Sequence, residues 1–141
     1  MRRPAVAIPT LLCIDDRTQM LELRRSTLEA HNYSVKVASS GYTALKVLEE
    51  TPVAAVLLEY KSEGMDAEAV AYQIKQLFPK LPIILLSAYS EMPERIMWLV
   101  DEYVLKSELP DGLFRVLEQK VRQPWFAPSP NQWRKASAIA A

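Results

Sequence analysis

The sequence predicts an α/β fold in which a five-stranded parallel sheet carries helices on both faces. Two observations support this fold class: short continuous apolar runs recur along the chain, and segments with apolar residues at helical spacing separate them. Strand and helix alternate five times, which is typical of a doubly wound parallel sheet. Of the 141 residues, 50% are hydrophobic and 24% are charged, so the chain can fill one core.

Three of the predicted strands are continuous apolar runs, which suit strands covered on both faces: 11–14, 53–58 and 83–86. The alternating segment 34–38 and the short segment 103–105 suit edge strands. This assignment agrees with the flavodoxin-like strand order 2-1-3-4-5, which places the second and fifth strands at the edges.

Apolar residues at helical spacing predict helices over 20–30, 44–48, 70–78, between Pro93 and Val100, and over 113–121. We divide the chain into an N-terminal extension (1–9), one domain (10–122) and a C-terminal tail (123–141). The tail is rich in proline and aromatic residues, and its proline density disfavours a continued helix.

The composition excludes several classes of function. Lys plus Arg and Asp plus Glu each number 17, so a generic basic nucleic-acid surface is not expected. Cys13 and His31 are the only residues of their types, which excludes an intrachain disulfide and a multi-histidine metal site. No apolar run approaches the roughly 20 residues of a membrane helix. We expect a cytoplasmic protein without nucleic-acid or membrane partners.

Polar residues follow the predicted strands where each strand ends. Asp15 and Asp16 follow the first strand, Glu59 ends the third, Ser87 follows the fourth and Lys106 follows the fifth. The carboxyl ends of parallel strands share one edge, so the three carboxylates should converge and either shift their pKa values or recruit a cation such as Mg²⁺. With Lys106 as a fixed charge and Ser87 as a hydroxyl, the set predicts a phosphoryl-binding site.

The segments around these residues resemble the response-regulator receiver domain of two-component signalling. The resemblance covers about residues 10–121 and rests on five blocks in the family's order: 11–16, 40–45, 56–60 with 64–66, 85–88, and 101–106. It implies a phosphoryl group received from a histidine kinase on an aspartate, with Mg²⁺ bound by the acidic pair. It also implies a hydroxyl and an aromatic residue that reorient and change a partner-binding face.

By position, the resemblance assigns a role to each of these residues. Asp15 and Asp16 match the metal-binding acids, and Glu59 stands at the acceptor position beside them, as a third carboxylate toward the metal. Ser87 matches the hydroxyl switch residue and Tyr103 the aromatic one. Lys106 matches the family's lysine and, with Ser87, would bind phosphate.

The sequence departs from the family pattern at the acceptor, where the resemblance implies aspartate and this chain has Glu59. Glutamate carries its carboxylate one methylene further, and a displacement near 1 Å can cost about 100-fold when reacting groups must align. We therefore expect impaired or absent phosphotransfer. Glu59 reaching toward Lys106 and Ser87 would imitate a phosphorylated aspartate in part, with one charge and two oxygens instead of nearly two charges and three.

The other departures lie in the loops. Ser107 and Glu63 stand where the family has proline, and Ala67 where it has glycine. The stretch from Ser87 to Lys106 is also shorter than the family norm, which predicts a short or distorted fourth helix.

These observations predict a stand-alone receiver that is not an enzyme and acts by protein contact. Its partner would be a histidine kinase, another signalling protein or a second copy. Two alternatives stay open: a Mg²⁺-dependent phosphoryl-transfer or hydrolase enzyme, and a dimerisation module whose acidic pocket is vestigial. The acidic pair could also simply cap the first helix. Met97 and Trp98, within the five-residue apolar run 96–100, predict a partner face unless the aromatic tail covers them.

Overall fold

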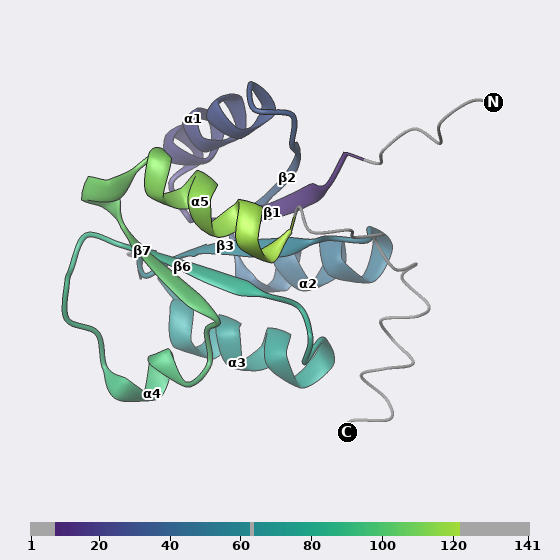
Figure 1. Cartoon of the computed structure of the whole chain (residues 1–141). Helices are drawn as coiled ribbons and strands as arrows, with labels where there is room; N and C mark the ends of the chain where they lie inside the picture. The colour runs from purple at the N-terminus through teal and green to yellow at the C-terminus, as the bar shows by residue number, and fades with distance from the viewer. Residues whose placement is uncertain (1–7, 63, 122–141) are drawn as a thin grey trace.

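The computed structural model describes residues 8–62 and 64–121, and the predicted tail lies outside this range (Figure 1). In chain order, the elements are β1 (Thr10–Ile14), α1 (Thr18–Glu29), β2 (Ser34–Ala38), α2 (Gly41–Glu50), β3 (Ala55–Glu59), β4 (Lys61–Ser62), β5 (Met65–Asp66), α3 (Ala67–Leu77), β6 (Ile83–Ser87), α4 (Glu94–Met97), β7 (Glu102–Leu105), the 3-10 helix η1 (Lys106–Glu108) and α5 (Asp111–Lys120). Five strands form one sheet in the order β2-β1-β3-β6-β7, with every neighbouring pair parallel. The predicted order 2-1-3-4-5 is confirmed.

Two apolar layers sandwich the sheet because successive side chains of each central strand point to opposite faces. In β1, Leu12 and Ile14 pack with α2, α3 and α4, whereas Leu11 and Cys13 pack with α1 and α5. Figure 1 shows the same division, with α1 and α5 above the sheet and α3 and α4 below it. All five residues of β3 and of β6 are buried, as expected for strands covered on both sides.

Two of the helices have a side-chain cap at their first turn. The Ser40 hydroxyl accepts a hydrogen bond from Thr43 N at 3.1 Å and caps α2, and Asp66 caps α3 by accepting from Ala69 N at 3.2 Å. The N-cap residue of α1 is Arg17, which makes no capping side-chain bond. Of the acidic pair before α1, Asp15 accepts a hydrogen bond from the backbone N–H of Arg17 at the helix start, at 3.0 Å.

Two details differ from the expectations. The antiparallel pair β4–β5, in the register Lys61↔Asp66 and Ser62↔Met65, was not predicted, because two-residue strands leave no periodicity to detect. The fourth helix is four residues long, which confirms that it is short. Among the described residues no helix has the length and apolar character needed to cross a bilayer.

Candidate functional site

The candidate site lies at the carboxyl edge of the sheet, where the central strands end. Glu59 and Ser87 are the last residues of β3 and β6, and these two strands are neighbours. Asp15 directly follows β1, and Lys106 directly follows β7. The structure brings Glu59, Asp15 and Lys106 together as predicted from the ends of parallel strands.

Glu59 is the centre of the site and is only 3% exposed. Its Oε1 lies 2.5 Å from Lys106 Nζ and 3.6 Å from Arg17 Nη2. Its Oε2 lies 3.9 Å from Arg24 Nη2 and has no hydrogen-bond partner in the described structure. The carboxylate thus has three cations around it, with one close ion pair.

Burial raises the pKa of Glu59 above its ordinary value of 4.5. Lys106 acts in the opposite direction, by hydrogen bonding and by charge, without cancelling the cost of burial. The negative charge of Asp15 adds to the increase. Burial therefore disfavours the charged form of Glu59, and the surrounding cations offset only part of this effect.

The two acids after β1 have different surroundings. Asp15 is 4% exposed, and its Oδ1 accepts hydrogen bonds from Arg17 N at 3.0 Å and from Arg17 Nε at 3.4 Å. Arg17 Nη2 donates to the other oxygen of Asp15, Oδ2, at 3.3 Å. Asp16 Oδ2 accepts from Gly64 N at 2.5 Å, which ties the β4–β5 turn to the end of β1.

The predicted switch residues contact the loop after β6. The Ser87 hydroxyl donates to Tyr89 O at 3.2 Å and accepts from Tyr89 N at 2.9 Å. Tyr103 Oη donates to Ser90 O at 3.0 Å, and its ring packs at the edge of the core on the α4 side. In this arrangement the Ser87 hydroxyl makes its hydrogen bonds within the loop that follows β6.

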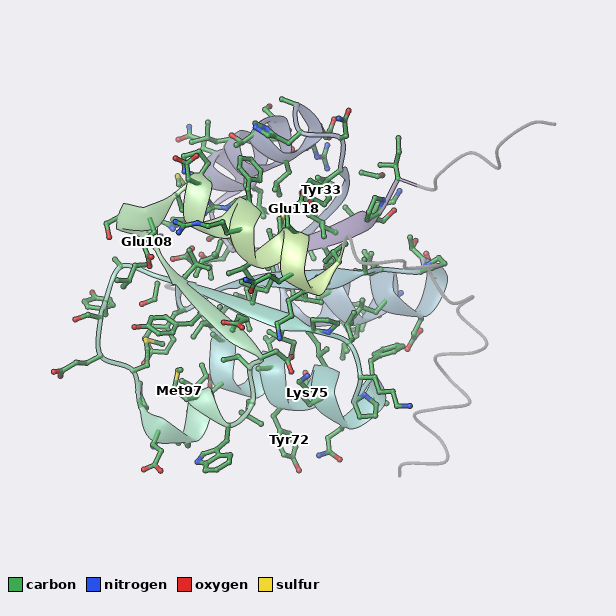
Figure 2. All side chains as sticks on the ribbon, in the orientation of Figure 1. Tyr33, Tyr72, Lys75, Met97, Glu108 and Glu118 are labelled. Atoms are coloured by element: carbon green, nitrogen blue, oxygen red, sulfur yellow. The ribbon has the colours of Figure 1, made fainter. Side chains whose placement is uncertain are left out.

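The predicted partner face lies at the end of α4. Ile96 fills the core at 1% exposure, whereas Met97 is 39% and Trp98 is 82% exposed. Figure 2 shows Met97 at the α4 end of the molecule. Within the described residues the Trp98 side chain is exposed to solvent. The C-terminal tail, which we named as a segment that could cover it, lies outside the described residues.

Sequence reasoning missed two basic residues of the site. Arg17 and Arg24 are seven residues apart, which is close to two helical turns, so both side chains lie on one side of α1. The seven-residue spacing of these two arginines, directly after the acidic pair, was the sequence signal that could have identified them. Gly64 belongs to the block 64–66 of the resemblance, but no site role was predicted for it: a Cβ there would lie 3.1 Å from Asp16 Oδ2, closer than ordinary van der Waals contact.

The donors present do not fit Mg²⁺ in this arrangement. In the described parts of the chain, no group of three His, Cys, Asp or Glu side chains is placed to hold a metal ion. The oxygens of Asp15 face Arg17, and Oε1 of Glu59 faces Lys106 and Arg17. The carboxylate oxygens that would have to face a divalent cation thus already face guanidinium and ammonium groups.

The fold and this strand-end cluster define a receiver-type α/β domain. The family model described as response regulator receiver domain matches residues 11–118. The chain belongs to the response regulator receiver domain family.

Among the curated relatives, the transcriptional regulatory protein GlrR of Escherichia coli (strain K12) is 28% identical over 130 residues, covering 89% of this chain and 29% of GlrR. ZraR, a transcriptional regulatory protein of the same strain, is 29% identical over 112 residues, covering 77% of this chain and 25% of ZraR. The chain therefore spans less than a third of the length of these two relatives.

Among solved structures, the response regulator TrrA of Thermotoga maritima, in complex with Mg²⁺–BeF, is 30% identical, with a TM-score of 0.73 over 80% of this chain and 99% of TrrA. The receiver domain of a Pseudomonas aeruginosa sensor histidine kinase has a magnesium ion in its active-site cleft. It is 20% identical, with a TM-score of 0.73 over 83% of this chain and 100% of that domain, a likeness that concerns the fold alone.

Proposed function

We propose that this chain is an atypical receiver of two-component signalling that acts by protein contact and does not carry out ordinary phosphotransfer. The observation that carries the proposal is the 2.5 Å ion pair between Lys106 and the buried Glu59. The Oε1 atom that Lys106 engages must give up that contact before it can attack a phosphoryl group, and Arg24 Nη2 lies 3.9 Å from the other oxygen, Oε2. The extra methylene of glutamate also moves the carboxylate away from the position that an aspartate would hold.

The ion pair imitates a phosphorylated acceptor only in part. Glu59 engages Lys106, as a phosphoryl group on the acceptor would, but with one charge and two oxygens. The Ser87 hydroxyl stays on Tyr89, so the imitation does not extend to the switch hydroxyl. Glu59 therefore forms the ion pair with Lys106, while the Ser87 hydroxyl keeps its hydrogen bonds to Tyr89 in the loop after β6.

The proposed output is contact with another signalling protein. Receiver domains act with histidine kinases, and a kinase, another regulator or a second copy is the class of partner we propose. The exposed Met97 and Trp98 would supply an apolar contact at the end of α4. We propose no enzymatic turnover, no nucleic-acid or membrane contact, and a cytoplasmic location.

The test is intact-mass measurement after incubation with acetyl phosphate and Mg²⁺. The native chain should gain no phosphoryl group, and labelling of Glu59→Asp would show that the extra methylene is the main obstacle. Glu59→Ala is the matched control that loses the carboxylate. Labelling of the native chain that disappears in Glu59→Ala would show that Glu59 is a working acceptor and would refute the proposal.

A second candidate function is a dimerisation module with a vestigial pocket, which the 82% exposure of Trp98 favours. Light scattering after size exclusion would compare the native chain with Trp98→Ala. Tyr42→Ala is the control, because Tyr42 is 71% exposed on a different helix, α2. A native dimer that only Trp98→Ala disrupts supports this function, whereas a monomer over the accessible concentrations contradicts it.

A further inference from the structure

Arg17 joins two acids that come from different strand ends. Its Nη2 lies 3.3 Å from Asp15 Oδ2 and 3.6 Å from Glu59 Oε1. Its Nε is 3.4 Å from Asp15 Oδ1. Both acids are at most 4% exposed, whereas the Arg17 side chain is 47% exposed. A single guanidinium thus covers the solvent side of two buried carboxylates.

The charges of the site balance within the chain itself. Its three carboxylates carry −3 and its three cations carry +3, and these groups are Asp15, Asp16, Glu59, Arg17, Arg24 and Lys106. Adding a divalent cation to this set would leave an excess of +2 in a partly buried site. An excess of like charge at short range is unfavourable where water screens poorly.

The backbone fixes Arg17 in this position. Arg17 N donates to the same Asp15 carboxylate at 3.0 Å, so the Cα of Arg17 is anchored beside the acid that its side chain contacts. Helix α1 begins at the next residue and brings Arg24 to within 3.9 Å of Glu59 Oε2. The Arg24 side chain is only 13% exposed. Arg17 therefore contacts Asp15 and Oε1 of Glu59, while Arg24 lies near the other oxygen of Glu59, Oε2.

We propose that Arg17, supported by Arg24, takes the place of the divalent cation at this receiver site, so that the resting site is neutralised by its own side chains and excludes Mg²⁺. This inference deepens the proposed function and rests on it, because a site that does not transfer phosphate has no need of the metal. Arg17 is a positioning residue here: it holds Asp15 and Glu59 together.

The test measures Mg²⁺ binding directly, by calorimetric titration of the native chain and of Arg17→Ala with MgCl₂ at constant ionic strength. We expect no saturable binding by the native chain in the millimolar range. Removing the guanidinium uncovers two carboxylates, and we expect Arg17→Ala to show saturable binding at least about tenfold tighter than the limit that the native titration sets. Thermal unfolding gives a second readout: MgCl₂ should raise the midpoint of Arg17→Ala and leave that of the native chain unchanged.

Arg25→Ala is the matched control, because it removes the same charge from α1, the helix that Arg17 directly precedes. Arg25 pairs with Glu22 at 3.7 Å and Glu29 at 3.8 Å, away from the strand ends. Arg25→Ala should behave as the native chain. An equal gain in Mg²⁺ affinity in both variants would mean a general charge effect and would overturn the proposal. Saturable binding by the native chain, or no gain in Arg17→Ala, would overturn it as well.

The inference and the proposed function fail in different ways. If the native chain binds Mg²⁺ but gains no mass from acetyl phosphate, the inference about Arg17 is refuted and the proposed function is not. If the native chain is phosphorylated on Glu59, the proposed function is refuted, whatever the affinity for Mg²⁺. Each variant is compared with its own metal-free form, so a loss of basal stability in Arg17→Ala does not affect the result.

Discussion

Lys106 Nζ lies 2.5 Å from Oε1 of Glu59, so the residue after β7 and the last residue of β3 are joined across β6 at the sheet edge. Glu59 is almost fully buried, whereas the Lys106 side chain is 25% exposed. The lysine therefore serves both as the nearest counter-charge of Glu59 and as its boundary with solvent.

Replacing Lys106 should destabilise the fold, because it leaves a buried carboxylate with only the more distant arginines. We expect Lys106→Met to lower the free energy of unfolding by about 1–3 kcal/mol in urea at neutral pH. Lys120→Met is the control, since Lys120 forms only a partly exposed pair with Glu102 at 3.7 Å. That control should change stability by less than about 0.5 kcal/mol. Equal losses in both variants would contradict a special role for Lys106.

Glu59 should give the fold a particular pH dependence. Its folded-state pKa is raised above 4.5 by burial, so the folded protein binds this proton more readily than the unfolded chain does. Lowering the pH from neutral, through the folded-state pKa and toward 4.5, should then increase the contribution of Glu59 to stability.

Glu59→Gln isolates this contribution because it cannot titrate. The stability of Glu59→Gln relative to the native chain should be greatest at neutral pH and should fall as the pH approaches 4.5. Urea unfolding of both proteins across this range measures the difference. A difference that is constant, or that grows toward acid pH, would show that the folded-state pKa is not raised.

Asp101 should contribute more to stability than an ordinary surface acid. Its Oδ2 accepts from Lys75 Nζ at 2.6 Å and from Ile83 N at 2.8 Å, and Lys75 also donates to Leu81 O at 3.0 Å. These bonds tie α3 and the start of β6 to the turn before β7. Asp101→Ala should cost about 1–3 kcal/mol, whereas Glu22→Ala, which removes one exposed pair on α1, should cost less than about 0.5 kcal/mol. Denaturant unfolding compares the two.

Cys13 should be unreactive in the native protein. It is 2% exposed in β1, and burial raises the pKa of its thiol to about 12, so the thiolate is scarce near neutral pH. A chromogenic disulfide reagent should label no thiol in native conditions and one thiol per chain in strong denaturant. Rapid labelling of the native chain would mean that β1 opens without global unfolding.

The sheet was predictable because its physical signal is strong. Each central strand is a continuous apolar run, and the two edge strands differ from the others in length or in alternation, which indicated the strand order. The positions of Glu59, Asp15 and Lys106 followed from the same strands, since parallel strands end at one edge.

The contacts within the site could not be predicted, because they depend on the direction in which individual side chains point. Arg17 and Arg24 reach the acids only because α1 begins at Thr18, and a shift of one residue would rotate both away. The Ser87 hydroxyl could have faced Lys106 or its own loop, and the nearby backbone of Tyr89 decides between them. Residue types at strand ends do not contain that information.

The loop after β6 is held by side chains from two neighbouring strands: Ser87 bonds Tyr89, and Tyr103 bonds Ser90. Because these attachments act on consecutive residues, releasing either one alone leaves the loop bound to the sheet by the other. We therefore expect the loop to open only when the hydrogen bonds of both hydroxyl groups are broken. Hydrogen exchange of its amides should accelerate together when both Ser87→Ala and Tyr103→Phe are present, and by much more than the two single variants add up to.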